Sequence, residues 1–180
     1  MKILLITQVF YPDTVSVSQH LWDLAKYLKI NGHDITVFSS AYPYEEKNEK
    51  YSNYDEVKGV KIHRINQSKF GKSRPIFRVL DFFTFSFNIG LKLFFIKKNS
   101  YDLILGTTVP PLLSFQGVLL SKIKKIPFYY WVMDLQPELS IASNLIKKDS
   151  ISAKFLSYIG NFSIKYSKKI ISLDSFMTAY

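Results

Sequence analysis

The fold class is indicated by residues 2–39, which read KILLITQVFYPDTVSVSQHLWDLAKYLKINGHDITVFS. The run from Lys2 to Val9 is rich in isoleucine and leucine, which is typical of a strand buried on both faces of a parallel sheet. Apolar residues then recur at helical spacing from Ser18 to Ile30, and Asp34–Ser39 predicts a second buried strand. A strand–helix–strand unit of this length requires a right-handed crossover in a parallel sheet.

The first helix has start and stop signals of its own, because Ser16 or Ser18 can act as N-cap and Asn31-Gly32 can end it. The same alternation continues along the chain. The further strands that we expect are Val60–Ile65, Tyr101–Leu105, Phe128–Met133 and Lys169–Leu173, and the further helices are Ile76–Lys98, Leu112–Lys125 and Ile151–Tyr166. This order predicts an α/β, three-layer, Rossmann-like fold with a mostly parallel sheet and helices on both faces.

Two segments receive more particular interpretations. Val60–Ile65 alternates apolar and polar residues, with Lys61, His63 and Arg64 counted as polar, so we place this strand nearer an edge. Residues 42–58 are polar and turn-rich, and we expect no strand there. Residues 1–180 form one domain in this interpretation. Because Ser175–Tyr180 resembles the opening of another helix, we expect the domain to be cut before a second one.

Composition narrows the functional classes. The 180 residues contain no cysteine, which excludes disulfides, thiolate metal sites and cysteine redox chemistry. Lysine and arginine outnumber aspartate and glutamate by 24 to 14, for a net charge of +10. The chain should therefore attract polyanions such as nucleic acid, anionic lipid or phosphorylated substrates.

Neither a signal peptide nor a membrane span is expected. The apolar run Ile3–Ile6 is too short for a signal peptide. The longest apolar stretch, Phe82–Ile96, is interrupted by polar residues and falls short of the roughly 20 residues that a spanning helix needs. We therefore expect a cytoplasmic protein.

Ligands of doubly wound sheets bind outside the carboxyl ends of the strands, so polar residues in the loops there are candidates for a site. The segment 11–18 offers hydroxyls and the N–H groups of a helix N-terminus, although plain N-capping by its serines is an alternative. It contains no glycine, so the dinucleotide and Walker fingerprints are both absent. The substrate-binding candidates are Asp13, Thr14, Ser16, Ser18, His20, Thr107 and Glu138.

Asp134 is the catalytic candidate, because it follows a strongly apolar strand and precedes the turn at Pro137. A carboxylate at this position can act as general base or accept hydrogen bonds from sugar hydroxyls. The structural alternative is that Asp134 caps the turn at Pro137. Glu138 suits a first helical turn for electrostatic reasons alone, so a structural role is favoured there.

The three histidines lie far apart in sequence and none has ligand spacing to a carboxylate pair, so no metal site is expected. His33 follows Gly32 and is expected to bond locally at the turn between helix and strand. His20 lies in the first turn of a helix that faces the loops, and it is the histidine that we expect to function.

The stretch from Lys69 to Lys98 combines basic residues with many phenylalanines, a pattern typical of segments that lie in a membrane interface. The alternative is that most of these phenylalanines belong to the core. The residues predicted to contact the membrane are Lys69, Lys72, Arg74, Arg78, Phe94, Phe95, Lys97 and Lys98.

Several segments in this order resemble the glycosyltransferases of family 4, in the branch that assembles O-antigen, capsule and exopolysaccharide. They are Lys2–Thr7, Phe10–Asp13, Leu24-Ala25, Gly32–Val37, Trp131–Glu138 and Ser172–Met177. The resemblance spans nearly the whole chain and rests on the order and spacing of the segments.

The resemblance implies the N-terminal, acceptor-binding half of a two-domain GT-B enzyme that retains anomeric configuration without metal or other cofactor. A nucleotide sugar would be the donor, held mainly by a second domain, and a lipid-linked or other saccharide the acceptor. Asp134 matches the position of an active-site histidine or aspartate in this family. Serine and valine replace a glycine pair in the loop Asp13–Ser18. Such an enzyme would be peripheral on the inner face of the plasma membrane.

Two other interpretations remain open. A non-catalytic subunit could anchor a separate donor-domain chain at the membrane. A nucleic-acid binder is suggested by charge alone, and we expect no nucleic-acid partner because the lysines are dispersed and no binding motif is present.

Overall fold

The computed structural model describes residues 1–44, 50–70 and 75–179. The strands are β1 (Lys2–Ile6), β2 (Asp34–Ser40), β3 (Tyr54–Val57), β4 (Val60–Ile65), β5 (Leu103–Thr107), β6 (Phe128–Trp131) and β7 (Lys169–Ile171). The helices are α1 (Ser16–Ile30), α2 (Pro75–Phe94), α3 (Pro111–Lys124), α4 (Glu138–Ala142), α5 (Ile151–Tyr166) and α6 (Ser175–Ala179).

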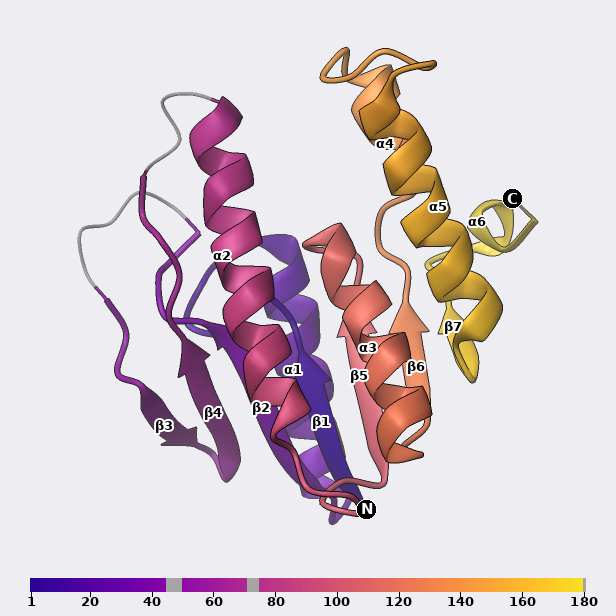
Figure 1. The fold of residues 1–180 in the computed structure, drawn as a ribbon. Coiled ribbons are helices and arrows are strands. Elements are labelled where there is room, and N and C mark those ends of the chain that lie inside the picture. Colours follow the sequence, from indigo (N-terminus) through magenta and orange to yellow (C-terminus); the bar gives the residue numbers. More distant parts are fainter. Residues whose placement is uncertain (45–49, 71–74, 180) are drawn as a thin grey trace.

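The strands form one sheet in the order β3-β4-β2-β1-β5-β6-β7, and every pairing except β3 with β4 is parallel. Helix α1 covers one face of this sheet, whereas α2, α3 and α5 lie on the other (Figure 1). The prediction of a three-layer Rossmann-like fold is confirmed.

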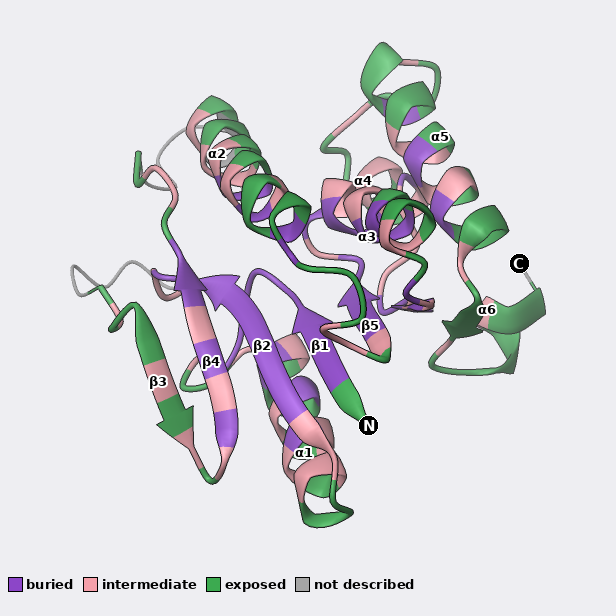
Figure 2. Cartoon of the chain, turned by 60° about the horizontal axis from the view of Figure 1, so that its bottom comes forward, coloured by how far each residue is buried: buried purple, intermediate pink, exposed green. Residues whose placement is uncertain are grey.

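Strand β1 is apolar at consecutive positions because both of its faces are buried. Ile3 and Leu5 belong to the hydrophobic cluster beneath α1, whereas Leu4 and Ile6 belong to the cluster beneath α2 and α3. Alternate side chains of a strand point to opposite faces, so a strand between two helical layers needs apolar residues at every position. Figure 2 shows β1 and β2 buried over most of their length.

A ring and two glycines set the distance between α3 and the sheet. The Phe128 ring is fully buried, and a Cβ atom on Gly117 of α3 would lie 2.3 Å from it. A Cβ on Gly106 of β5 would lie 2.9 Å from the same ring. Both glycines therefore make room for an aromatic side chain at the centre of the core.

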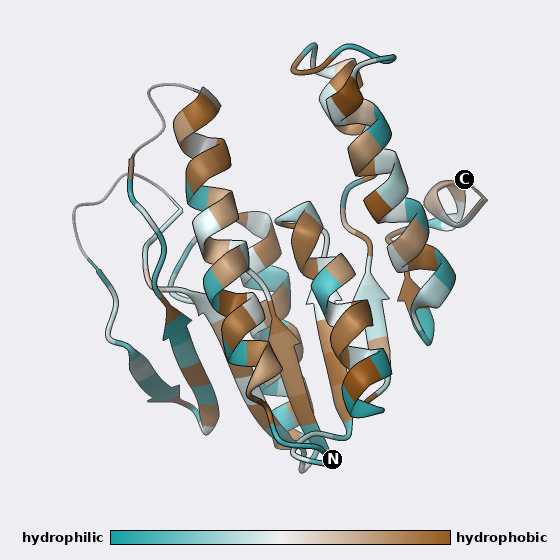
Figure 3. Ribbon diagram, viewed as in Figure 1, coloured by the Kyte–Doolittle hydropathy of each residue, from teal (hydrophilic) through white to brown (hydrophobic). Residues whose placement is uncertain are grey.

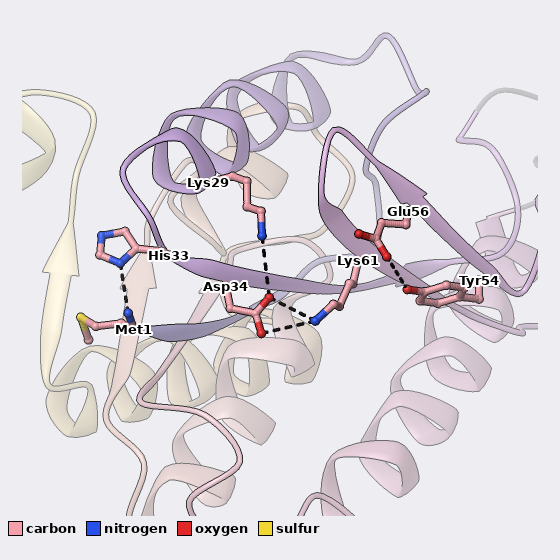
Figure 4. A network of polar contacts seen from close by, with 7 residues as sticks. All are labelled: Met1, Lys29, His33, Asp34, Tyr54, Glu56 and Lys61. Carbon is pink, nitrogen blue, oxygen red and sulfur yellow. Dashed lines mark hydrogen bonds and ion pairs between the residues drawn. The ribbon is translucent and has the colours of Figure 1, made fainter.

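Charged side chains join elements at the amino ends of the strands (Figure 4). The Asp34 carboxylate accepts a hydrogen bond of 3.2 Å from Lys61 Nζ, and Lys29 Nζ lies 4.0 Å away. His33 Nδ1 lies 3.2 Å from the amino group of Met1, so the His33 ring bonds to the residue that precedes β1. All these groups are partly exposed, and such pairs contribute little to stability.

Two local predictions are wrong. The segment Tyr54–Val57 forms the edge strand β3, which pairs antiparallel with β4. The two strands are joined at Lys58 and Gly59, whose φ values of 50° and 76° suit a two-residue hairpin turn. Helix α1 begins at Ser16 after Val15 as N-cap, with no side-chain cap, so neither Ser16 nor Ser18 is the N-cap.

Replacing Gly117 with alanine should destabilise the fold, because the new methyl group would overlap the Phe128 ring. Overpacking of this kind costs about 1–3 kcal/mol of unfolding free energy. Urea denaturation followed by circular dichroism measures the change. Gly32→Ala is a poor control because Gly32 has a positive φ, whereas Ser121→Ala on the same helix as Gly117 is suitable. A Gly117→Ala protein as stable as the unaltered chain would contradict this account of the packing.

Candidate functional site

The loops that follow β1, β5, β6 and β7 meet at the carboxyl edge of the sheet, where they border a pocket of about 430 Å³. Its lining residues are Val9, Val15, Ser16, Val17, His20, Tyr44, Val109, Met133, Asp134 and Leu173. Six of these side chains are aliphatic or thioether groups. The pocket therefore combines an apolar wall with one carboxylate, one imidazole, one aliphatic hydroxyl and one phenol.

Three predicted residues line this pocket together. Ser16 and His20 lie one helical turn apart at the start of α1, and Asp134 follows β6 after two buried residues, Val132 and Met133. The parallel order of β1 and β6 about β5 brings these segments to one edge, although 114 positions separate His20 from Asp134 in the chain. No side-chain cap is present at α4, whose N-cap is Pro137, so Asp134 does not cap that helix.

The other predicted residues do not line the pocket. Ser18 is buried and its Oγ has no hydrogen-bond partner among the described residues. Thr107 is also buried, with its Oγ1 3.5 Å from Thr7 Oγ1. Thr14 is exposed and its carbonyl accepts from the Gln19 amide, while Glu138 is the first residue of α4.

Asp13 does not line the pocket but holds one of its lining residues through hydrogen bonds. Its carboxylate Oδ1 accepts a hydrogen bond of 3.1 Å from the Tyr44 backbone N–H and one of 3.2 Å from the Tyr51 hydroxyl. These bonds fasten the first loop to the segment that follows β2. They position Tyr44, which lines the pocket, so Asp13 acts on the pocket through its neighbour.

Arg64 is a buried cation beneath the same loop, with 6% of its surface exposed. Its guanidinium donates to Ser39 Oγ at 2.9 Å and to the Tyr11 carbonyl, and its Nε lies 3.7 Å from the Asp55 carboxylate. It also stacks over the Tyr51 ring at 4.6 Å. Arg64 therefore joins β2, β3 and β4 to the loop after β1.

Burial lowers the pKa of Arg64, and the nearby charges of Asp55 and Asp13 oppose that shift. Burial raises the pKa of Tyr51 to about 12, with further contributions from the charge of Asp13 and the hydrogen bond to it. Tyr51 therefore stays protonated and donates to Asp13 throughout the physiological range.

A smaller cavity of about 30 Å³ lies behind Asp134, between α3, α5 and β6. Thr108, Ser114, Tyr130 and Asp134 are among its lining residues, and this volume is enough for one water molecule. Burial raises the pKa of Tyr130, and the charge of Asp134 adds to the shift. Asp134 therefore lies between the open pocket and this smaller, mostly apolar cavity.

The predicted membrane residues lie on or next to α2. Phe94 and Phe95 are 60% and 77% exposed, and Lys97 and Lys98 are exposed as well. The Lys69 ammonium lies 5.5 Å from the centre of the Tyr42 ring. Lys72, Arg74 and the side chain of Arg78 lie outside the described part of the chain. Among the described residues, no helix is long and apolar enough to cross a membrane.

A carboxylate and an imidazole at one pocket can bind hydroxyl groups and transfer protons. In the part of the chain that the structure describes, no group of three or more histidine, cysteine or acidic residues could hold a metal ion. The side chains of Asp134 and His20 can supply hydroxyl binding and acid–base assistance.

No family model and no curated protein matches the sequence. Solved structures do match. Sucrose-phosphate synthase from Thermosynechococcus elongatus aligns over 100% of this chain and 44% of its own, with a TM-score of 0.70 and 12% identity. HepE from Anabaena, solved with UDP-glucose, aligns over 94% of this chain and 36% of its own, with a TM-score of 0.51 and 14% identity.

The catalytic domain of starch synthase IV from Arabidopsis thaliana, bound to ADP and acarbose, aligns over 73% of this chain and 34% of its own, with a TM-score of 0.51 and 14% identity. The present chain folds like half of a GT-B glycosyltransferase. It spans less than half the length of each of these structures.

Sequence reasoning missed Arg64 in this GT-B-like half, although a signal was present. Arg64 shares its strand face with Val60 and Ile62, because side chains two apart lie on one face, and both are buried. Grouping Arg64 with the half-buried Lys61 and His63 was therefore wrong. The apolar pocket residues Val9, Val109, Met133 and Leu173 were also missed, since nothing separates them from core residues in the sequence.

Replacing Arg64 with methionine should cost roughly 2–4 kcal/mol of unfolding free energy, because it leaves carboxylates without their buried cation. Lys61→Met on the same strand is the control. It removes only a partly exposed pair with Asp34 and should cost less than about 1 kcal/mol. Urea denaturation of both variants measures the difference. Equal effects would show that Arg64 does not hold the loop in place.

Proposed function

We propose that this chain is the acceptor-side half of a retaining glycosyltransferase similar to family 4. The enzyme transfers a sugar from a nucleotide sugar to a lipid-linked saccharide during synthesis of a cell-surface polysaccharide. A second domain, in the same or a separate polypeptide, holds most of the nucleotide sugar. No metal or other cofactor takes part, and the protein works on the inner face of the plasma membrane.

The observation that carries this proposal is the pocket at the carboxyl edge, in a fold shared with half of several glycosyltransferases. Two of those structures contain UDP-glucose or ADP with acarbose, which supports a sugar-nucleotide reaction. An apolar wall with a carboxylate suits a saccharide, whose ring has apolar and hydroxyl-bearing sides.

We assign Asp134 the central role in the pocket, where it binds or deprotonates an acceptor hydroxyl. His20 and Ser16 orient the acceptor from the first turn of α1. Asp13 keeps the bordering loop in place. Thr14, Ser18, Thr107 and Glu138 are proposed to support the substrate less directly, since none of them lines the pocket.

A lipid-linked acceptor requires the protein at the membrane, and α2 offers exposed aromatic and basic residues for that contact. Of the predicted membrane residues that the structure describes, Phe94 ends α2, Phe95, Lys97 and Lys98 follow it, and Lys69 precedes it. On an anionic leaflet each nearby cation adds about 1 kcal/mol of attraction.

A second candidate function is a non-catalytic subunit that anchors a donor-domain chain at the membrane. The exposed aromatic residues of α2 favour it equally, whereas the pocket containing Asp134 favours the acceptor-binding half. A neighbouring reading frame that encodes a donor domain would be consistent with both, so saccharide binding is the discriminating property.

Asp134→Asn should weaken binding of a short-chain polyprenyl-diphosphate-linked saccharide by about tenfold or more, because a charge-assisted hydrogen bond is worth roughly 1.5–3 kcal/mol. Titration calorimetry measures the affinity, and the exposed Asp149→Asn is the matched control. Saccharide binding that is unchanged in Asp134→Asn, or absent in the unaltered chain, favours the anchoring subunit. Tighter binding of nucleotide sugar than of saccharide would identify a donor-side half instead.

The purified chain alone should transfer no sugar. Catalysis requires donor and acceptor to be held together, and that proximity lowers the barrier by roughly 7–11 kcal/mol. The measurement is incorporation of radiolabel from nucleotide sugars into lipid-linked saccharide, with and without a donor-domain polypeptide. Transfer by the chain by itself would contradict the division of labour between two halves.

A further inference from the structure

Helix α2 has two apolar faces. Phe85, Ile89 and Leu93 are buried against the sheet. On the opposite side, apolar side chains that are 38–60% exposed recur at three- and four-residue spacing: Ile76, Val79, Leu80, Phe83, Phe87, Leu91 and Phe94. Apolar colour accordingly returns along the whole length of α2 in Figure 3. A helix packed on a sheet needs only one such face, so the second is available to another partner.

The outer surfaces of α3 and α5 continue this apolar character. Leu119 and Ile123 of α3 are 38% and 56% exposed, and Phe155 and Tyr158 of α5 are 53% and 62% exposed. Helix α3 lies between the other two and contacts both of them. The three helices thus present one broad outer surface, which we call the α2–α3–α5 surface.

Positive charge is in excess over negative charge in this layer. Each of the three helices contains two basic residues, and the sequence of the layer contains one acid, Asp81. Asp81 Oδ1 accepts hydrogen bonds from the Ser68 hydroxyl at 2.7 Å and from the Phe70 N–H at 3.1 Å. Other acids lie on other elements, for example Asp23 on α1 and Glu56 on β3.

Lysines of α3 lie at both seams between the helices. Lys124 Nζ is 5.6 Å from the centre of the Phe94 ring of α2, and Lys122 Nζ is 3.5 Å from the centre of the Tyr166 ring of α5. Cations over aromatic rings therefore extend across the layer from α2 to α5. Ammonium groups beside aromatic and aliphatic side chains match the boundary between lipid headgroups and acyl chains.

We propose that the whole α2–α3–α5 surface docks on an anionic lipid bilayer, so that the sheet lies along the membrane and α1 faces away from it. This inference rests on the membrane contact of α2 in the proposed function and extends it to α3 and α5. A lipid surface is favoured over a protein partner because the cores of protein interfaces are depleted of lysine, whereas lysines around apolar side chains suit anionic headgroups.

The orientation fixes where the pocket lies. The loops that line it follow the carboxyl ends of the strands, at one side of the helical layer. With that layer on the bilayer, this edge of the sheet stands at the side of the docked protein, and Ser16 and His20 of α1 lie farther from the membrane than α2 and α3. A saccharide on a lipid diphosphate can then enter the pocket while its lipid remains in the membrane.

Tryptophan fluorescence tests the orientation. The native tryptophans, Trp22 and Trp131, both pack with the hydrophobic cluster on the α1 side. We would replace both with phenylalanine and introduce either Phe83→Trp on α2 or Tyr158→Trp on α5. Vesicles of phosphatidylglycerol and phosphatidylcholine with brominated acyl chains should quench both introduced tryptophans and leave those of the unaltered chain largely unquenched.

Neutralising matched pairs of lysines tests the electrostatic contribution to vesicle binding. Lys154→Gln with Lys165→Gln on α5 should lower the vesicle partition coefficient by roughly 30-fold, because two cations near the surface are lost. Lys26→Gln with Lys29→Gln on α1 should leave it unchanged. Far-ultraviolet circular dichroism confirms that each variant is folded.

The outcomes separate this inference from the proposed function. Quenching at position 83 but not at 158, with no effect of the α5 lysine pair, would overturn the inference and leave the α2 contact intact. Absence of vesicle binding by the unaltered chain would overturn both. Self-association at this surface, or binding of duplex DNA without vesicle binding, would also overturn it, and neither would affect saccharide binding at Asp134.

Discussion

Burial of the central strand β1 on both faces is the constraint on which the rest of the structure depends. Leu4 and Ile6 on one face, and Ile3 and Leu5 on the other, are each nearly or fully buried. A strand of this kind requires a helical layer on both sides, and right-handed crossovers then place α1 opposite α2, α3 and α5. The loops after the strands consequently gather at one edge, and the pocket follows from that gathering.

The sequence predicted the elements whose local pattern agrees with their surroundings. Strands β1, β2, β5 and β6 are apolar because both of their faces are covered. The edge strand β3 could not be found in this way, since Tyr54, Asp55, Glu56 and Val57 have little apolar surface to bury. Its pairing depends on the hairpin turn at Lys58-Gly59, where glycine suits the left-handed backbone.

The candidate site was predictable to the extent that it depends on topology. Ser16, His20 and Asp134 were expected together because parallel strands end at one edge of a sheet. The direction in which Asp13 turns was not predictable, because it depends on Tyr44 and Tyr51, which arrive from a segment with no regular pattern. Arg64 was within reach, since strict alternation from Val60 and Ile62 places it on a buried face, where a cation needs carboxylate and hydroxyl partners.

Helix α2 contains more phenylalanines than packing on the sheet requires. Phe85 lies on the buried face, whereas Phe83, Phe87 and Phe94 form an exposed stripe on the opposite face. Apolar surface removed from water contributes roughly 25 cal/mol per Å², so a continuous exposed stripe favours association with some apolar phase. The charge of the surrounding residues favours an anionic lipid bilayer over a protein partner as this phase. With one acid in the three helices, repulsion of anionic headgroups is small, and the lysines at the helix seams attract these headgroups. The same sheet that brings the pocket residues to one edge therefore also sets the angle at which that edge meets a membrane.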